Sequence, residues 1–434
     1  MSALNRRGLI GAGLMLGAAG ATTAATQAQA QSQTQATAPS LPAGPGAPQD
    51  QDYWRAVAAQ YDVTREVIQL ENGNYGMMAR PVLEAYKRHL TKVNTESSFY
   101  TRRTIGPDTS RARARVAANL GVDVEEITFT RGATESLMTL IQGYNKLRPG
   151  DQVMYADLDY DSTQNAFHWL QARRGVELVT FDLPQQATHQ NLLDAYEAAL
   201  ANHPKVRLLL LTHVGHRTGL VMPVPEIMEI ARRHNVDVVL DVAHSWGQLD
   251  FKLPDLKADF VGLTCQKWIG APIGVGVVYI RRDRIHDIDI APGNDQVPSD
   301  RIHDRVHTGT SNFAGFLSVT EALDFHEAVG ARAKEMRLRH LRDRWAEALR
   351  DHGRIEILTP QDPRLTCGIT SFRLKGKVSE AENRALSADL LKRFNIFTVE
   401  RSGTAIGSCV RVTPGIFTQE AEIDHLVDAL KTMA

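Results

Sequence analysis

The chain has 434 residues, of which 43% are hydrophobic and 23% charged, a composition typical of a globular protein with a large core. Its 49 basic and 50 acidic residues give a formal net charge of −1, and no long basic run alternates with aromatic residues, so a nucleic-acid partner is not indicated. The three cysteines, Cys265, Cys367 and Cys409, are too few for a disulfide framework and lack the spacing of a zinc cluster. These properties favour a small-molecule substrate.

The first 50 residues differ in composition from the rest. Arg6 and Arg7 form a twin-arginine start, followed by an apolar stretch rich in glycine and alanine and by the small-residue sequence AQA at 28–30. We predict that residues 1–30 are a Tat export signal, which makes the Tat machinery a partner and the periplasm the destination. Residues 31–50, rich in Gln, Ala and Pro, predict a disordered linker.

Beyond residue 110, amphipathic helical patterns alternate with short apolar runs, which is typical of a mostly parallel sheet covered by helices. Helices are expected over 192–201 and 225–234. Several runs are apolar on both faces, as buried parallel strands are. Seven runs are predicted as strands: 127–129, 153–155, 176–179, 208–211, 238–240, 260–263 and 277–280. The fold class is therefore α/β, with a large doubly wound domain over 76–320.

A smaller domain is predicted to follow over residues 321–434. A charged helix over 316–352 would be a solvated connection between the two lobes. After it, the segments 368–372, 397–399 and 409–412 predict antiparallel strands, and 419–433 predicts a closing helix. This C-terminal domain is expected to be of the α+β type.

Two charged residues end apolar runs in the predicted sheet. Asp241 follows the run 238–240, and Lys267 ends the segment 259–267. Because the carboxyl ends of the strands face the ligand crevice of such a sheet, a carboxylate and an amine placed there can meet across one flat molecule. Pyridoxal phosphate suits this pair, since its pyridine nitrogen needs a carboxylate and its aldehyde forms a Schiff base with lysine. Taken singly, Asp241 could cap a helix and Lys267 could be a surface lysine.

The surrounding sequence strengthens the cofactor interpretation. The motifs DVAH at 241–244 and QKW at 266–268, followed by the glycine-punctuated segment 270–276, resemble the cofactor segment of class V aminotransferases. The resemblance covers nearly all of residues 60–430. It implies the fold of the pyridoxal-phosphate-dependent transferases (aspartate aminotransferase-like, fold type I), with residues 51–75 packing on the small domain. The most similar subgroups are isopenicillin N epimerase-like proteins and periplasmic enzymes that modify the glutamate of pyoverdine precursors.

A turn at residues 132–136 (GATES) lies between a predicted strand and an apolar helix. Its free backbone N–H groups and the Thr134 hydroxyl can hold an anion. An ordinary helix N-cap is the alternative. The resemblance implies that Ala133 and Thr134 bind the cofactor phosphate.

The resemblance implies further cofactor contacts. Tyr160 would stack on the ring, although an ordinary loop tyrosine is equally consistent with the sequence. His216 would donate to the ring oxygen, His244 would lie beside the ring, and Gln266 would donate to the phosphate. Thr310 would reach the phosphate of a neighbouring subunit, which implies a homodimer. No third ligand accompanies the two nearby histidines of the segment 212–219, so no metal site is predicted.

Two arginines are candidates for substrate binding. Arg411, in the sequence RVTP, matches the family arginine that binds the substrate α-carboxylate, and its alternative is a strand arginine paired with an acid. Arg217 departs from the family pattern. It could hold a second substrate carboxylate or pair with an acid.

The implied activity is chemistry at the Cα-amino group of an amino acid or a peptide-like substrate, by transamination or epimerisation through Lys267. Lyase or desulfurase activity is disfavoured, because the segment 401–405 contains no cysteine to accept sulfur. A catalytically silent protein that only binds the cofactor or another ligand is the remaining alternative. Tat export of an already folded protein is consistent with a cofactor inserted before export.

Overall fold

The computed structural model describes residues 41, 42, 44 and 46–434. The predicted export signal, residues 1–30, and the first ten residues of the predicted linker lie outside the described residues. No helix in the described part of the chain is long and apolar enough to cross a membrane.

The linker prediction is wrong for its last few residues. Asp50 caps the first helix, α1 (Gln51–Ala58), by accepting from the Tyr53 N–H. The indole N–H of Trp54 donates to the Ala47 oxygen at 2.8 Å, and the Arg337 guanidinium donates to the Pro48 oxygen at 2.9 Å. Buried donors need acceptors, so these two side chains fix the segment in place.

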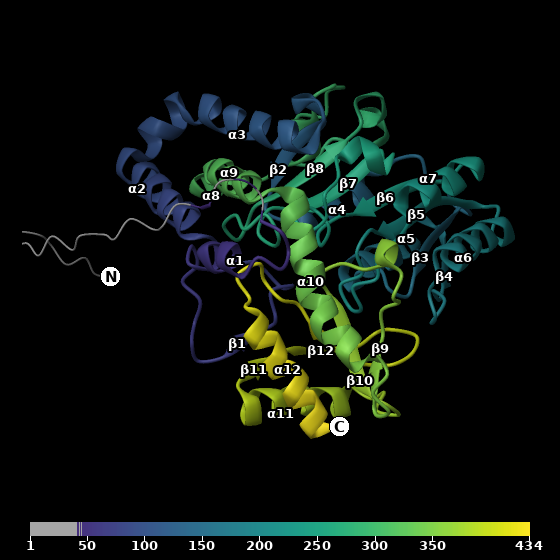
Figure 1. Cartoon of the computed structure of the whole chain (residues 1–434). Coiled ribbons are helices and arrows are strands. Elements are labelled where there is room, and N and C mark those ends of the chain that lie inside the picture. Colours follow the sequence, from purple (N-terminus) through teal and green to yellow (C-terminus); the bar gives the residue numbers. More distant parts are fainter. Residues whose placement is uncertain (1–40, 43, 45) are drawn as a thin grey trace, which may run out of the picture. The chain divides into compact units, whose positions relative to one another are not determined.

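A seven-stranded sheet forms the large domain, and each of the seven strands predicted between residues 127 and 280 belongs to it (Figure 1). The strand order is β2-β8-β7-β6-β5-β3-β4, in which β8 runs antiparallel to its neighbours β2 and β7 and the other paired strands are parallel. The strands are β2 (Ile127–Thr130), β3 (Gln152–Ala156), β4 (Glu177–Phe181), β5 (Val206–Thr212), β6 (Asp237–Asp241), β7 (Phe260–Thr264) and β8 (Gly276–Ile280). The predicted mostly parallel sheet is confirmed.

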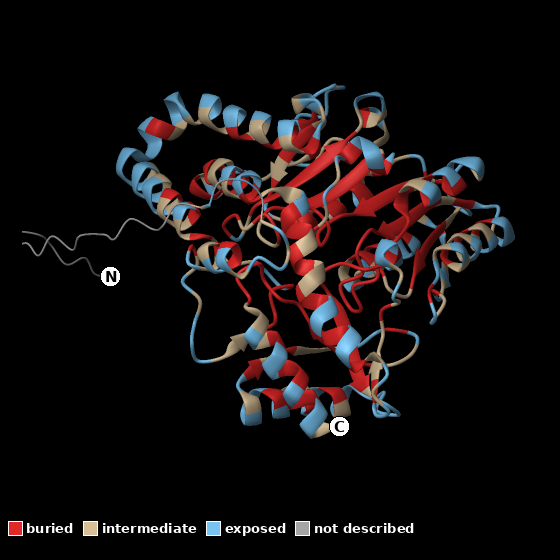
Figure 2. Ribbon diagram, in the orientation of Figure 1, coloured by how far each residue is buried: buried red, intermediate tan, exposed pale blue. Residues whose placement is uncertain are grey.

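Helices cover both faces of this sheet, as a doubly wound fold requires. Along β5, Leu209 and Leu211 belong to one core cluster and Leu208 and Leu210 to another, because successive side chains of a strand point to opposite faces. Figure 2 shows these central strands as buried. The first cluster includes α3 (Ile105–Leu120), α6 (His189–Asn202) and α7 (Val224–Arg233), and the second includes α4 (Ala133–Gly143) and α5 (Asp161–Arg174).

Helix α2 (Arg80–Arg103) was not predicted from the sequence. It precedes residue 110, where the predicted alternation of helices and strands begins. Only Val82, Ala85 and Tyr100 are buried in it, so it lacks the apolar stripe that identifies an amphipathic helix. The helix is kinked at Ser97, which has a φ of 46°.

The predicted single helix over 316–352 is wrong in two respects. The chain forms three helices there, α8 (Phe313–Leu317), α9 (Val319–Val329) and α10 (Ala331–Arg350). Gly330, with a φ of 89°, separates the last two, and only glycine adopts this backbone readily. Several charged residues of α10 are also buried, not solvated: Arg337, for example, is 0% exposed and donates to the Thr418 oxygen at 3.2 Å.

The small domain contains an antiparallel sheet of order β12-β13-β10-β9, as predicted, with a separate hydrophobic core. The predicted strand 397–399 is divided between two sheets, since β11 (Ile396–Phe397) pairs in parallel with β1 (Ile68–Gln69). Through β1, part of the segment 51–75 contacts this domain. The remaining elements are β9 (Ile355–Ile357), β10 (Thr370–Leu374), α11 (Glu380–Phe394), β12 (Val399–Arg401), β13 (Cys409–Val412) and α12 (Glu420–Met433). Short 3-10 turns occur at Val124–Glu126, Leu253–Leu256, Arg282–Asp287, Ile302–Arg305 and Pro363–Leu365.

Candidate active site

A pocket of about 390 Å³ lies at the carboxyl ends of β5, β6 and β7, where Thr212, Asp241 and Thr264 end their strands. It is lined by every predicted cofactor contact except Thr310. The lining residues are Asn74, Arg131, Gly132, Ala133, Thr134, Glu135, Leu137, Tyr160, Thr212, His216, Asp241, Ala243, His244, Thr264, Gln266 and Lys267. The sheet therefore brings side chains from distant parts of the sequence to one edge.

Lys267 is the amine of this pocket. Its Nζ lies 2.9 Å from Nε2 of His244. Burial lowers the pKa of Lys267 to about 8, although Asp241 acts in the opposite direction. A lowered pKa increases the fraction of neutral amine, which is the nucleophilic form.

Asp241 supplies the carboxylate. Its side chain is 4% exposed, and Oδ1 accepts the Ala243 N–H at 2.8 Å. Burial raises the pKa of Asp241, while this hydrogen bond and the charge of Lys267 oppose that rise. The carboxylate thus stands in a site where a positively charged ring nitrogen would stabilise it.

The turn before α4 presents free N–H groups to the pocket. The helix begins at Ala133, and no side chain caps it at the N-cap residue Gly132. Thr134 therefore lies inside the first turn and is not the N-cap. An uncapped helix N-terminus carries partial positive charge and unpaired donors, so it suits a phosphate group.

His216 and His244 leave unsatisfied atoms in this site. Both are buried, and burial is the main reason that their pKa values lie well below 6.5; the charges of Arg411 and Lys267 lower them further. Both imidazoles are therefore neutral. The Nδ1 atom of each has no hydrogen-bond partner among the described residues. A polar ligand in the pocket would satisfy buried atoms of this kind.

Tyr160 and Gln266 both line the pocket. The Tyr160 ring packs edge-on against His216, with centroids 5.1 Å apart. Gln266 Oε1 accepts the Gly274 N–H at 2.7 Å, which leaves its amide N–H groups for another acceptor. Both orientations are compatible with the contacts that the sequence predicted.

The N-terminal segment also reaches this site, which the sequence did not indicate. The Gly76 N–H donates to the Gln266 oxygen at 2.7 Å. A Cβ at Gly76 would lie 1.9 Å from the Lys267 oxygen, so only glycine fits there without movement. Residues 71–76 thus connect the small domain to the backbone at Gln266 and Lys267.

Asp159 is another residue that the sequence did not single out. It is 2% exposed and accepts the Thr212 hydroxyl at 2.7 Å. Burial raises its pKa to about 7, and the nearby Asp241 contributes to the rise. Its only sequence signal was its position just after a strand.

Arg217 is not available to a substrate in this structure. Its guanidinium pairs with Asp161 and donates to the oxygens of Asp157 and Asp159 at 2.9 Å and of Ser402 at 2.7 Å. The sequence left open whether Arg217 binds a substrate carboxylate or pairs with an acid. In the structure it pairs with an acid, Asp161. Because Arg217 is 2% exposed, its donors all need such partners.

Arg411 lies beside the pocket and also has an acidic partner. Its NH1 donates to the His216 oxygen at 2.7 Å, and its NH2 donates to Glu71 at 2.5 Å. Thr310, in contrast, is exposed and lies away from the pocket lining. Its predicted role requires a second subunit and stays a prediction.

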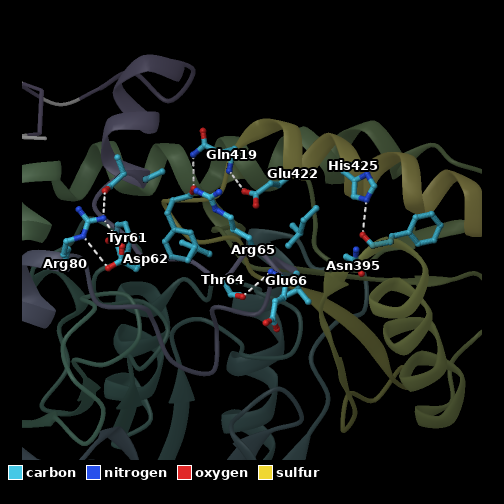
Figure 3. A pocket seen from close by; sticks show the side chains of 17 residues that line it. Tyr61, Asp62, Thr64, Arg65, Glu66, Arg80, Asn395, Gln419, Glu422 and His425 are labelled. Carbon is cyan, nitrogen blue, oxygen red and sulfur yellow. Dashed lines mark hydrogen bonds and ion pairs between the residues drawn. The ribbon is translucent and has the colours of Figure 1, made fainter. Parts of the chain in front are cut away.

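A larger hollow, of about 1140 Å³, lies between the loop 58–68 and helix α12 (Figure 3). Its polar groups pair with one another: Arg80 donates to Asp62 at 2.9 Å, and His425 lies 3.1 Å from the Phe394 oxygen. No lysine lines it. The smaller pocket at the strand ends, which contains Lys267, is therefore the candidate active site.

Comparison with known proteins identifies the family of this chain. The chain matches the aminotransferase class-V family over residues 76–426. It belongs to that family. Class V aminotransferases use pyridoxal phosphate, so the predicted cofactor is confirmed.

Relatives and solved structures extend the comparison. Isopenicillin N epimerase of Streptomyces clavuligerus is 27% identical over 398 residues, covering 88% of this chain and 98% of that protein. The apo cysteine desulfurase of Thermococcus onnurineus superimposes with a TM-score of 0.76 at 21% identity, over 90% of this chain and 99% of the other. The cystine C–S lyase C-DES, in complex with cysteine persulfide, gives a TM-score of 0.73 at 24% identity, over 84% and 97%. The predicted fold type is confirmed.

Proposed function

We propose that this protein is an exported pyridoxal-phosphate enzyme that acts at the Cα-amino group of an amino acid or a peptide-like substrate, by aminotransferase or epimerase chemistry. One observation carries the proposal: Lys267, with its lowered pKa, shares one pocket with the buried Asp241 and the uncapped N-terminus of α4. These are the three groups that an aldehyde, a pyridine nitrogen and a phosphate need.

The residues of the pocket fit the cofactor. The N–H groups at Ala133 and Thr134 would hold the phosphate, and Asp241 would hold the ring nitrogen in its protonated form. The free Nδ1 atoms of His216 and His244 would meet polar groups of the ring. When bound, the cofactor supplies an electron sink for the electron pair released at Cα.

Lys267 performs the proton transfer. The Lys267 amine would remove the Cα proton of the bound substrate, and its pKa, lowered by burial to about 8, increases the fraction of the amine in the basic form. His244, 2.9 Å from Nζ, orients that amine as a neutral partner. Tyr160 restrains one side of the ring site. The bound cofactor would support either outcome: epimerisation, if the proton returns to the opposite face of Cα, or transamination, if the amino group is released from the substrate carbon.

Substrate orientation would depend on Arg411, whose guanidinium lies next to His216 at the pocket wall. The similarity to isopenicillin N epimerase over 98% of that protein supports epimerase chemistry on a peptide-like substrate. The family match alone supports transamination equally well.

Desulfurase or lyase activity is the second candidate, because cysteine desulfurases and a C–S lyase share the fold. The described cysteines do not favour it. Cys265, Cys367 and Cys409 are all buried, and burial raises the pKa of Cys409 to about 11. A sulfur-accepting cysteine needs an accessible thiolate.

The test is the Lys267→Ala variant of the mature protein, compared with wild type after incubation with pyridoxal phosphate. Wild type is expected to develop a visible absorbance band that responds to amino acids and to a γ-glutamyl peptide, with turnover of an amino donor or exchange of the Cα proton. The variant is expected to lack both. A wild-type protein that binds the cofactor without any turnover would support the silent binding protein instead, and release of sulfide from cysteine would support the desulfurase.

Export and dimerisation are separate parts of the proposal. The twin-arginine start of residues 1–30 supports Tat export to the periplasm. The exposed position of Thr310 supports a homodimer in which it reaches the partner's phosphate. Replacing Arg6 and Arg7 by lysine should retain the protein in the cytoplasmic fraction, and Thr310→Ala should weaken cofactor retention.

A further inference from the structure

Arg411 already holds a carboxylate that the chain itself supplies. Its guanidinium is 1% exposed and donates to Glu71 Oε1 at 2.5 Å. Glu71 follows β1 and lies 340 residues upstream, with its backbone fixed by a bridge to Thr413. A buried carboxylate thus occupies the arginine that the proposed function assigns to the substrate.

A second arginine shares the same carboxylate. Arg401 donates to Glu71 Oε1 at 3.2 Å, and the Thr413 hydroxyl donates to Oε2 at 3.3 Å. The Arg401 side chain is 29% exposed, so it has more freedom than Arg411. The Nε atoms of both arginines have no hydrogen-bond partner among the described residues. Two guanidinium groups therefore face one carboxylate, and the cluster can accept one more anion.

This cluster adjoins the pocket. Gly73, next to the pocket residue Asn74, lies so close to Arg411 that a Cβ there would come within 2.9 Å of its NH2 nitrogen. After burial, the positive charges of Arg411 and Arg401 contribute to the lowered pKa of Lys267, and the charge of Glu71 opposes them. The cluster is therefore electrostatically coupled to the catalytic amine.

We propose that Glu71 determines specificity as a resident carboxylate, which occupies Arg411 in the free enzyme and is displaced onto Arg401 by the α-carboxylate of the substrate. This inference rests on the proposed function, since it needs an amino-acid substrate at the pocket. Substrate binding then exchanges one carboxylate for another at Arg411, and both guanidinium groups end with one partner each. An amine without a carboxylate cannot make this exchange.

The test uses Glu71→Gln, which keeps the shape of the side chain and removes its charge. Binding of L-alanine and L-alaninamide is measured by absorbance titration of the cofactor-loaded enzyme and by calorimetry of the cofactor-free protein. L-alanine should bind roughly tenfold more tightly to the variant, because no internal anion competes for a charge-assisted contact. The affinity for L-alaninamide should change by less than about twofold. The control is Glu66→Gln, because Glu66 is an exposed glutamate of the same segment. This control should change the affinity for neither ligand.

Equal effects on the two ligands, weaker binding of L-alanine, or no heat from L-alanine in either cofactor-free protein would overturn the proposal. If Glu71→Gln does not fold, Arg401→Gln replaces it. That variant keeps the Arg411–Glu71 pair but removes Arg401, the second partner of Glu71. L-alanine should therefore bind roughly tenfold more weakly, and the affinity for L-alaninamide should be unchanged. Unchanged L-alanine binding there would also overturn it. Failure of the wild type to form any cofactor band contradicts the proposed function instead, and the calorimetry still tests Glu71.

Discussion

The two halves of the candidate site are built in different ways. On the large-domain side, Asp241 ends a strand of the sheet, and Lys267 and the turn before α4 each come just after a strand of the same sheet. On the small-domain side, Glu71, Arg401 and Arg411 come from separate segments and meet through ion pairs. The first half needs only the sheet, whereas the second exists only when the N-terminal segment is docked against the small domain.

The largest effect is expected on the large-domain side, from Asp241→Asn. Loss of the carboxylate leaves the ring nitrogen unprotonated, so turnover should fall roughly 10³-fold, within the range for lost proton control in catalysis. Turnover per bound cofactor is the measurement, with the exposed Asp194→Asn as the control. Activity within about twofold of wild type would show that Asp241 does not control the ring.

On the small-domain side, the expected effect is on stability. Arg411→Met leaves Glu71 buried without its main partner, which should cost about 3–5 kcal/mol of unfolding free energy. The control is Arg233→Met, because the Arg233 side chain is 61% exposed in its ion pair with Glu197 and should contribute no more than about 1 kcal/mol. Urea denaturation followed by fluorescence would compare them. Equal losses would remove the distinction between the buried and the surface pair.

Gly76→Ala tests the connection between the two halves. A Cβ at this position would lie 1.9 Å from the Lys267 oxygen, so either the N-terminal segment or the lysine must move. A displacement of about 1 Å can cost roughly 10²-fold in rate, and a loss of that order is expected. Gly106→Ala is the matched control, since a Cβ there would meet nothing within 4 Å. Steady-state kinetics of the two variants would decide whether the segment positions the lysine.

The smallest predicted effect concerns pH. The pKa of Lys267 is lowered to about 8, so the amine is protonated below that pH and nucleophilic above it. The rate of cofactor incorporation into the cofactor-free protein should therefore rise about tenfold per pH unit below 8 and level off above it. Stopped-flow absorbance would measure this, with N-acetyl-lysine as the unburied reference. A profile that rises steadily through about pH 10, like the reference, would contradict the lowered pKa.

The same contrast explains how much could be predicted from the sequence. Strands such as 208–211 are short apolar runs, so the sheet and the residues at its ends, Asp241 and Lys267, follow from local pattern. Glu71 gave no signal, because its partners Arg401 and Arg411 lie more than 300 residues away. No local rule selects which acid pairs with a given arginine.

The errors in the small domain have a similar origin. Arg337 looked like part of a solvated helix face, because the acceptors that bury it come from Pro48 and Thr418 in other segments. The sequence also failed to predict that the helix breaks at Gly330, since an isolated glycine is tolerated inside many helices. Partners distant in the sequence thus cause the burial of Arg337, and the backbone conformation of Gly330 sets the helix boundary.

The central claim is that Lys267 is the amine that carries the cofactor. The direct measurement is to reduce the cofactor-loaded protein with borohydride, digest it, and locate the modified lysine by mass spectrometry. The account predicts the cofactor mass on Lys267. Lys334 is the competing site, because it is also buried and its pKa is lowered to about 7. The location of the modification therefore distinguishes the two lysines. Modification of Lys334, or of no lysine, would contradict the assignment.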